Sequence, residues 1–438
     1  MLPRKFSLPR GIRDAFPEEM AKRLWIFNKI MNVAKLYGFQ MVEPATIEYL
    51  ETLEAKSGPD IKNEIYYFKD KAGRDLGLRF DLTVGMTRMV ASRYDLPEPI
   101  KLYAIGGMWR YDEPQYGRYR YFYQWDAEIY GSSSPLADAE VISFGIDVLE
   151  EVGLKDFEVK INSRKFMDAF LKKLGLNEEK SLTIMRIIDK LRKKSKIEIE
   201  NQFKEAGLNE SLINKVFELV SLNGKPEKIL NQLPKEALET EESIKSFNEL
   251  NELFNYLNLL NKSNKCILDF SVVRGLDYYD GIVFEAYDKG GEDIGAIFGG
   301  GRFDKLCKIY GRDIPATGVA GGMERLMISM ERNNLFPNLS FQPEIFIAAA
   351  TSEVKNKVLE LIASLRKTGF SCDFDLKNKS LKQQLEYANS MGIPIVIIIG
   401  VKDLLNNQVT IKEMKSKMEF KTNINELHQA LKKILKRS

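Results

Sequence analysis

The chain has 438 residues, of which 44% are hydrophobic and 29% charged, with a formal net charge of +3. These values are typical of a soluble globular protein, and the length predicts two or three domains rather than one core. A net charge this small carries no argument for nucleic-acid binding. The N-terminus lacks the apolar run of a signal peptide, and the longest strongly apolar run, 393–399, is too short to span a bilayer. We therefore expect a cytoplasmic protein with no membrane association.

Cysteine and histidine usage excludes several kinds of chemistry. Cys266, Cys307 and Cys372 lie far apart in the sequence, which argues against a disulfide framework or a thiolate metal site. His428 is the single histidine and lies in an amphipathic C-terminal segment. The central region can therefore build no histidine triad, metal site or proton relay. Chemistry there must use arginines, carboxylates and bound ions, acting by positioning and electrostatics.

The sequence pattern of residues 18–161 predicts helices and short strands in alternation. Apolar spacing predicts a long amphipathic helix from Glu18 to Tyr37, stopped by Gly38 and followed by a strand from Phe39 to Val42. The elements expected next are a hairpin at 66–80, a helix at 81–91, a strand at 102–110, a helix at 136–152 and a strand at 157–161.

The segment WRYDEPQYGRYRYFYQWDAEIYG, from Trp109 to Gly131, has an unusual side-chain pattern. Successive side chains of a strand point to opposite faces. One face suits packing, and its members are Tyr119, Tyr121, Tyr123, Trp125, Ala127 and Ile129. The other face combines cations, a ring, an amide and carboxylates: Arg118, Arg120, Phe122, Gln124, Asp126 and Glu128. This row favours a floor that binds an anion at one end and an amine or imidazole at the other, and a charged outer sheet face is the alternative.

Residues 163–263 differ in character from their surroundings. Lys and Glu dominate, apolar residues recur at helical spacing, and strand-like alternation is scarce. We interpret this segment as an inserted helical domain. Its basic cluster (Lys190, Arg192, Lys193, Lys194 and Lys196) is either a solvated helix face or a phosphate-binding patch. The same alternatives apply to the cluster at Lys432, Lys433, Lys436 and Arg437.

Three glycine-containing segments follow the insertion. They read VRGLDYYDGIVFE (273–285), AIFGGGRFDKL (296–306) and ATGVAGGMERL (316–326). Three consecutive glycines suit a strand interior only where another group approaches the backbone closely. Beyond a linker at 335–343, strands and helices alternate over 344–438, which predicts an α/β domain with a largely parallel sheet.

Together these segments resemble the histidyl-tRNA synthetase family, which belongs to the class II aminoacyl-tRNA synthetases. RGIRDAFP (10–17) is similar to the N-terminal signature, YGFQMVEPATIE (37–48) to motif 1, 108–128 to motif 2 and the segment ending ERL at Leu326 to motif 3. RGLDYY and GGGRFD resemble the two histidine-specific motifs. Motifs 1 and 3 are degenerate, whereas RGLDYY combined with motif 2 is highly specific.

The resemblance implies an α+β fold. It implies a class II antiparallel-sheet catalytic core at 1–162 and 264–334, a helical insertion at 163–263 that helps to hold the tRNA acceptor arm, and an α/β anticodon-binding domain at 344–438. The helix–strand unit of motif 1 lies at the dimer interface in this class, so a homodimer is implied as well.

The resemblance also implies a two-step reaction. ATP and L-histidine form histidyl-adenylate and pyrophosphate, and the histidyl group then passes to the 3′ end of the histidine tRNA, with Mg²⁺ on the outer phosphates. The implied catalytic residues are Arg110 and Arg274. The implied ATP-binding residues are Arg110, Arg118, Phe122 and Arg325. The implied histidine-binding residues are Asp81, Leu82, Thr83, Arg110, Gln124, Glu128, Arg274, Tyr278 and Tyr279. No metal ligand is assigned.

Four positions depart from the bacterial pattern of the family. Asp81 stands where Glu is usual, Tyr123 where His is usual, Phe303 replaces a Tyr, and Glu113 replaces an Arg in the loop that reads the extra 5′ guanylate. Three alternatives remain: a regulatory paralogue that partners ATP phosphoribosyltransferase, an RNA-binding or signalling protein that kept the fold, and another class II synthetase. The first typically lacks the C-terminal domain and has a degraded RGLDYY segment, and both are intact here.

Overall fold

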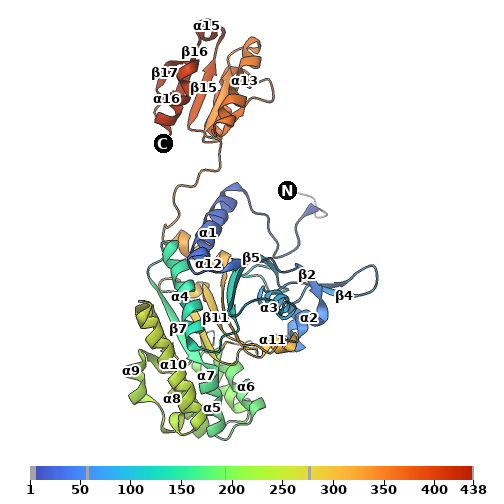
Figure 1. The fold of residues 1–438 in the computed structure, drawn as a ribbon, viewed down its shortest axis with the longest axis vertical. Coiled ribbons are helices and arrows are strands. Elements are labelled where there is room, and N and C mark those ends of the chain that lie inside the picture. The colour runs from blue at the N-terminus through green and yellow to red at the C-terminus, as the bar shows by residue number, and fades with distance from the viewer. Residues whose placement is uncertain (1–5, 56–58, 193, 275–277, 437–438) are drawn as a thin grey trace. The chain divides into compact units, whose positions relative to one another are not determined.

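The computed structural model describes residues 6–55, 59–192, 194–274 and 278–436. It consists of two compact units, Met1–Pro337 and Asn338–Ser438, each with its own core (Figure 1). Residues 275–277 of the RGLDYY segment lie outside the described part, as do Lys193 and Arg437 of the basic clusters.

Unit 1 is built on a sheet for which the described residues supply nine strands. Their order is β1 (Gln40–Met41), β5 (Ile100–Trp109), β6 (Tyr121–Tyr130), β12 (Ala316–Gly322), β11 (Phe298–Arg302), β10 (Ile282–Asp288), β7 (Phe157–Ser163), β9 (Cys266–Asp269) and β8 (Asn223–Gly224). Every pairing from β5 to β7 is antiparallel, whereas β1 with β5 and β7 with β9 are parallel. This mainly antiparallel sheet with helices against it confirms the predicted α+β class.

Helices α1 (Pro17–Leu36) and α4 (Pro135–Glu151) share one hydrophobic core with the sheet. Trp125 of β6 packs edge-on against Phe144 of α4 and Phe298 of β11, with ring centroids 5.9 and 6.3 Å apart. Helix α4 begins where Ser134 accepts a hydrogen bond from the Leu136 backbone N–H, ahead of a proline in its first turn. The odd-numbered residues of β6 from Trp125 to Ile129 are buried in this core, so the predicted packing face is confirmed there.

The expected helical segment forms a group at one end of unit 1, coloured green to yellow-green in Figure 1. Its helices are α5 (Arg164–Lys173), α6 (Glu178–Ile188), α7 (Lys196–Glu205), α8 (Glu210–Val220), α9 (Pro226–Ile229) and α10 (Glu241–Leu259). Side-chain caps at Ser163, Asn177, Ser195, Asn209 and Thr240 fix where five of them begin. The helices are interrupted between α8 and α9 by β8, whose backbone pairs with β9. Such pairing satisfies peptide groups that would otherwise lack partners.

A smaller sheet and short helices complete unit 1. The sheet has the order β2 (Ile47–Tyr49), β4 (Asp75–Leu78) and β3 (Tyr67–Lys69), and it contains the expected hairpin. The remaining α-helices described in this unit are α2 (Leu50–Glu54), α3 (Thr83–Ala91), α11 (Leu306–Ile309) and α12 (Met323–Arg332). Helix α12 follows β12 directly, within the segment ATGVAGGMERL.

Unit 2 has a sheet of the order β14 (Cys372–Phe374), β13 (Ile345–Ala349), β15 (Ile395–Ile399), β16 (Gln408–Glu413) and β17 (Glu419–Asn423). Its helices within the described range are α13 (Lys355–Lys367), α14 (Leu381–Ser390), α15 (Val401–Leu405) and α16 (Leu427–Ile434). The prediction of a largely parallel sheet is wrong for half of it, because β15, β16 and β17 pair antiparallel. The sequence analysis missed β17, a polar and largely exposed edge strand whose residues EFKTN give no clear apolar alternation.

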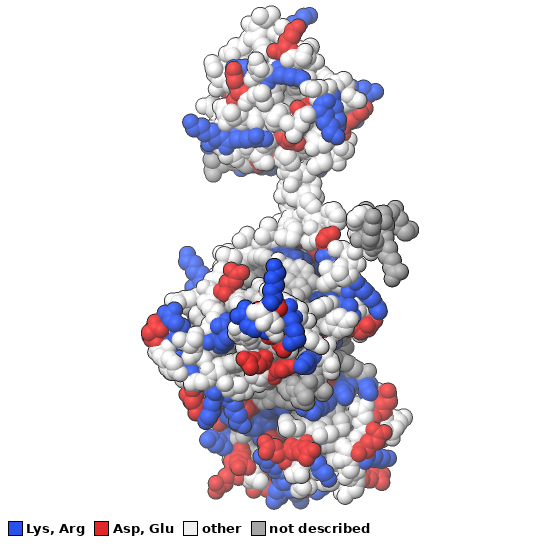
Figure 2. Space-filling view, turned by 90° about the vertical axis from the view of Figure 1, so that its right-hand side faces the viewer, with Lys and Arg blue, Asp and Glu red and all other residues white. Residues whose placement is uncertain are grey.

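The charged surface is mixed in sign. Figure 2 shows Lys and Arg side chains intermingled with Asp and Glu over the face in view, consistent with the small net charge. Among the helices formed by the described residues, none combines the length and the apolar character that a membrane crossing requires.

Candidate active site

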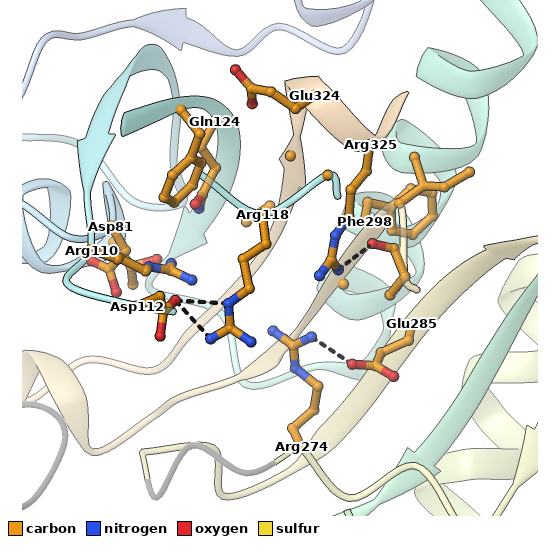
Figure 3. A pocket seen from close by; sticks show the side chains of 18 of the residues that line it. Asp81, Arg110, Asp112, Arg118, Gln124, Arg274, Glu285, Phe298, Glu324 and Arg325 are labelled. Atoms are coloured by element: carbon orange, nitrogen blue, oxygen red, sulfur yellow. Dashed lines mark hydrogen bonds and ion pairs between the residues drawn. The ribbon is translucent and has the colours of Figure 1, made fainter. Parts of the chain in front are cut away.

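A cavity of about 280 Å³ lies against the antiparallel sheet of unit 1. Its wall is contributed by β6, β10, β11, β12, the start of α12, the loop between β5 and β6, and the segment before β10. Figure 3 shows arginines entering it from several of these elements. The charged lining residues are Asp81, Arg110, Asp112, Arg118, Arg274, Glu285, Glu324 and Arg325.

Arg110 and Arg118 reach the cavity from the two ends of the β5–β6 loop. Nε of Arg110 donates to the Phe80 carbonyl at 2.8 Å, and its guanidinium lies 5.1 Å from the centroid of the Phe122 ring. Nε and Nη2 of Arg118 both donate to Oδ2 of Asp112, at 2.8 and 2.7 Å. Phe122 and Arg110 therefore form a flat surface backed by a fixed cation.

Arg274 enters from the opposite side, and a carboxylate fixes its direction. Its backbone has a φ of 54°, and its Nη1 donates to Oε1 of Glu285 at 2.8 Å (Figure 3). Nε of Arg274 is buried and has no hydrogen-bond partner among the described residues. Burial alone would lower the pKa of Arg274, but the tyrosines beside it and Glu285 together raise it. Arg274 is therefore a firmly charged cation with donor capacity to spare.

Arg325, at the start of α12, supplies a further cation. Its Nη1 donates to the Ala296 carbonyl at 3.0 Å. Burial lowers the pKa of Arg325, repulsion by Arg118 and Arg110 lowers it further, and only Glu285 and a tyrosine oppose this. Cations that repel one another in a cavity are relieved when an anion binds between them, so this arrangement is suited to a polyanionic ligand.

A polar group of side chains surrounds another part of the cavity. Nε2 of Gln124 donates to Oδ1 of Asp126 at 2.7 Å, and the hydroxyl of Thr83 donates to Oδ2 of Asp126 at 3.4 Å. The rings of Tyr278 and Tyr279 lie 4.2 Å apart by centroid. Burial and then the charge of Asp81 raise the pKa of Tyr278, which therefore stays a neutral hydrogen-bond donor.

The structure brings most of the predicted site residues to this one cavity and leaves two outside its lining. Glu128 is 1% exposed and accepts a hydrogen bond from the Tyr130 hydroxyl. Its side chain fits because a Cβ on Gly318 would lie 2.7 Å from Cγ of Glu128. Leu82 is fully buried in the core with Met86 and Val90. The Leu82 side chain therefore does not line the cavity, because an apolar side chain before α3 is buried in that core.

Three carboxylates of the lining were not predicted from the sequence: Asp112, Glu285 and Glu324. The clearest signal was Glu285, a charged residue inside the apolar strand IVFEAY. Both oxygens of Glu324 accept from the backbone N–H of Tyr123 at 3.2 Å, and burial raises the pKa of this carboxyl. Glu324 also joins β6 to α1, because Nη2 of Arg23 lies 3.6 Å from its Oε1.

The antiparallel sheet, the arginine that follows β5, the arginine at the start of α12 and the Phe122 ring in one cavity are the features that the sequence resemblance implies for a class II aminoacyl-tRNA synthetase. Within that class, residues 11–326 match the family described as histidyl-tRNA synthetase, and residues 344–434 match an anticodon-binding domain. The chain belongs to the histidyl-tRNA synthetase family.

Relatives from archaea are similar over almost the whole chain. A histidine–tRNA ligase of Pyrococcus horikoshii is 38% identical over 430 residues, which cover 98% of this chain and 99% of the relative. A histidine–tRNA ligase of Thermococcus kodakarensis is 39% identical over 412 residues, 93% of this chain and 94% of the relative.

Crystal structures of bacterial proteins share the fold. Histidyl-tRNA synthetase from a Nostoc species superposes with a TM-score of 0.83 at 26% identity, covering 98% of this chain and 99% of that one. A protein of Bacillus halodurans described as an ATP phosphoribosyltransferase regulatory subunit/histidyl-tRNA synthetase has a TM-score of 0.76 at 26% identity, covering 91% of this chain and 99% of that one.

Proposed function

We propose that the chain is a histidine–tRNA ligase, which joins L-histidine to ATP with release of pyrophosphate and then transfers the histidyl group to the 3′ end of the histidine tRNA. The observation that carries this proposal is the approach of Arg110, Arg118, Arg274 and Arg325 to one cavity whose wall also carries polar and aromatic side chains. A bent triphosphate would satisfy the cations, and a histidine would satisfy the polar wall.

In the first step the histidine carboxylate attacks the α-phosphorus of ATP and pyrophosphate leaves. The carboxylate is already the nucleophile, so the step needs no general base. Arg110 and Arg274 are the proposed catalytic residues, one on each side of the α-phosphate. Both guanidinium groups are fixed before substrate binds, Arg110 by the Phe80 carbonyl and Arg274 by Glu285. Preorganised charge of this kind stabilises the extra negative charge of the transition state.

The rest of the nucleotide is assigned to the same cavity. The Phe122 ring is proposed to stack on adenine, while Arg325 faces the γ-phosphate and adenine side and Arg118 contacts the outer phosphates. The lowered pKa of Arg325 supports this assignment, because a bound triphosphate would offset the repulsion that Arg118 and Arg110 exert on it.

Histidine is assigned to the polar part of the cavity. Asp81, Thr83 and Gln124 are proposed to bind the α-amino group, with the Leu82 backbone between the first two. Glu128 is proposed to accept from one imidazole nitrogen and Tyr279 to face the other, with Tyr278 alongside. Glu128 lies beneath the lining, so it would reach the ring from the closed end of the pocket. A pocket of paired donors and acceptors rejects side chains that leave these groups without partners.

Magnesium is proposed to enter with the phosphates of ATP. Among the described residues there is no group of three or more His, Cys, Asp or Glu side chains that could hold a metal ion. A Mg²⁺ ion that keeps its waters and binds phosphate oxygens needs only one or two protein carboxylates, so the site fits such an ion. Asp112, beside Arg118, is a lining carboxylate that could contribute one. The ion would neutralise charge on the leaving pyrophosphate.

The proposed domain roles follow the family matches. Residues 1–162 with 264–334 form the catalytic core, 163–263 the insertion that contacts the acceptor arm, and 344–438 the anticodon-binding domain. A cytoplasmic homodimer is proposed as well. It is supported by apolar side chains of α1 that are exposed in the single chain, at 53% for Leu24 and 85% for Leu36.

The decisive experiment is ATP–pyrophosphate exchange by the purified protein against all twenty amino acids. We expect exchange that depends on histidine alone, followed by charging of histidine tRNA. Absence of exchange with any amino acid, in a folded protein, would contradict the proposal and favour a regulatory role of the kind named for the Bacillus halodurans protein.

A further inference from the structure

A chain of contacts extends from Arg274 away from the cavity along β10. Oε1 of Glu285 accepts from Nη1 of Arg274 at 2.8 Å, and Oε2 of the same carboxylate accepts from the hydroxyl of Tyr287. Glu285 and Tyr287 are two residues apart in one strand and therefore lie on the same face. The carboxylate that directs Arg274 is thus itself held by Tyr287.

Tyr287 is covered by a cation from the helical segment. The guanidinium of Arg192, which lies between α6 and α7, is 4.3 Å from the centroid of the Tyr287 ring. Nη2 of Arg192 also donates to Oδ2 of Asp269 at 2.9 Å. Lys160 of β7 contacts the same two groups, with its Nζ 3.2 Å from Oδ2 of Asp269 and 5.7 Å from the Tyr287 ring centroid. The planar guanidinium of Arg192 lies nearer to both, so Arg192 restrains the ring more directly.

Asp269 connects Arg192 to Arg274 by a second route. It is the last residue of β9 and is 4% exposed, and its Oδ1 accepts from the backbone N–H of Ser271 at 3.0 Å. Ser271 lies three residues before Arg274, in the turn that leads to it. Arg192 therefore bonds the residue that anchors this turn as well as covering Tyr287.

The charged groups in this series of contacts stabilise one another. Burial would raise the pKa of Glu285, but Arg274, Tyr287 and Arg192 together lower it, so the carboxylate stays ionised. An ionised Glu285 is the form that holds a guanidinium firmly. Arg192 is not itself a buried structural cation, because its side chain is 32% exposed.

We propose that Arg192 is a positioning residue for adenylate formation, acting through Tyr287 and Glu285 on the guanidinium of Arg274. The inference rests on the proposed function, since it takes Arg274 as the cation at the α-phosphate. It gives the helical segment a part in the first chemical step, in addition to any contact that it makes with tRNA.

The test compares Arg192→Ala, Arg192→Lys and Tyr287→Phe in the full-length protein, with Lys194→Ala as the control. Lys194 is an exposed cation two residues further along the same basic segment. In histidine-dependent pyrophosphate exchange we expect Arg192→Ala to lower kcat by roughly 10-fold, because small misplacement of a catalytic group is costly. The KM values for ATP and histidine should stay within about 2-fold, since Arg192 touches neither.

Two further comparisons separate positioning from general stability. Arg192→Lys keeps the charge but loses the planar stack, so it should recover only part of the lost kcat. Tyr287→Phe keeps the ring on which Arg192 packs and removes only the hydroxyl bond to Glu285, so it should fold normally and still lower kcat. If Arg192 acts through Tyr287, the double variant Arg192→Ala/Tyr287→Phe should be no worse than Arg192→Ala alone.

The proposal would be overturned by exchange in Arg192→Ala equal to that of Lys194→Ala, by strictly additive losses in the double variant, or by a loss confined to tRNA charging. The last result would make Arg192 a phosphate contact for the acceptor arm. Each of these results leaves the proposed function standing. Absence of exchange in the unsubstituted protein would instead overturn the proposed function, and this inference with it.

Discussion

Arg110 and Arg274 are fixed by different kinds of partner. The carbonyl of Phe80 holds Arg110, so a neutral main-chain group sets its position. The carboxylate of Glu285 holds Arg274, so a charged side chain sets the position of Arg274. Because Arg274 also has a positive φ and a buried Nε without a partner among the described residues, its geometry is the more costly of the two to maintain. A residue whose geometry is maintained at such a cost in free energy, at the wall of a cavity, is typically one that binds a ligand.

Arg274→Ala should lower histidine-dependent pyrophosphate exchange by on the order of 10²-fold or more, since one preorganised donor to a transition-state oxyanion contributes about 2.7–4 kcal/mol. Arg274→Lys should also be strongly impaired, because an ammonium keeps the charge but lacks the planar fork that presents separate N–H donors to Glu285 and to a phosphate in a fixed geometry. Oligomeric state and thermal unfolding midpoint serve as controls. Exchange within about 2-fold of the unsubstituted protein for Arg274→Ala would contradict the catalytic role.

Glu128→Gln tests the proposed imidazole partner. The substitution keeps the shape of a buried side chain but removes its charge, so the apparent KM for histidine in exchange should rise about 10- to 100-fold, the range for a hydrogen bond to a charged group. The apparent KM for ATP should change little. Tyr130→Phe is the matched control, because it removes the hydroxyl bonded to Glu128 while leaving the carboxylate. An equal effect of both substitutions on histidine and ATP would indicate a structural role for Glu128.

At the scale of an element, β11 shows why glycines occupy a central strand. A Cβ on Gly299 would lie 2.5 Å from Nη1 of Arg274 and 3.1 Å from the Phe284 carbonyl oxygen. The missing side chain therefore makes room for the guanidinium of Arg274 over the sheet. This is the close approach that the run of glycines predicted from sequence.

Gly299→Ala should therefore displace Arg274 and lower pyrophosphate exchange by roughly 10-fold or more, with a loss of folding stability of about 1–3 kcal/mol from overpacking. Gly290→Ala is the control, because a Cβ there would meet nothing within 4 Å. Exchange kinetics and chemical denaturation measure the two effects. Similar kinetics for both variants would show that Arg274 does not depend on the space above Gly299.

The elements that the sequence predicted best are those whose pattern has one physical origin. The buried face of β6 follows from the alternation of side chains along a strand, and the start of α4 follows from its side-chain cap. Both elements form as expected. The strand β17 and the two-residue strand β8 did not follow, because their pairing depends on the backbone of a distant partner rather than on their own side chains.

The site residues likewise divide into those that the sequence predicted and those that it did not. Arg110, Gln124 and Arg325 could be predicted because each lies in a recognisable motif, and all three line the cavity. The partners that orient the arginines, such as Glu285, could not be assigned from sequence. Their role depends on the order of the strands in the sheet, and for Glu285 on the two strands that pair with β10.

At the scale of the whole molecule, each unit buries its own apolar residues. The core of unit 1 includes Trp125 and Phe144, whereas Ile345, Ile397 and Leu431 belong to a separate core in unit 2. Because no core cluster of the described residues draws on both units, each is expected to fold without the other. The cavity lies wholly in unit 1.

Ending the chain at Pro337 should therefore leave amino-acid activation largely intact while tRNA charging falls steeply. We expect exchange within about 3-fold of the full-length value, because none of the residues described in unit 2 lines the cavity. The charging rate at limiting tRNA should fall at least 100-fold, since linking two binding modules can raise affinity by about 10²–10⁴-fold and deletion removes that gain. A matched variant that keeps unit 2 but carries Arg274→Ala should show the opposite pattern: activation strongly lowered, with tRNA binding preserved in a filter assay. If the truncated protein instead lost exchange and charging to the same degree while remaining folded, unit 2 would be a structural support for the active site, and the proposed division of labour between activation and tRNA selection would be wrong.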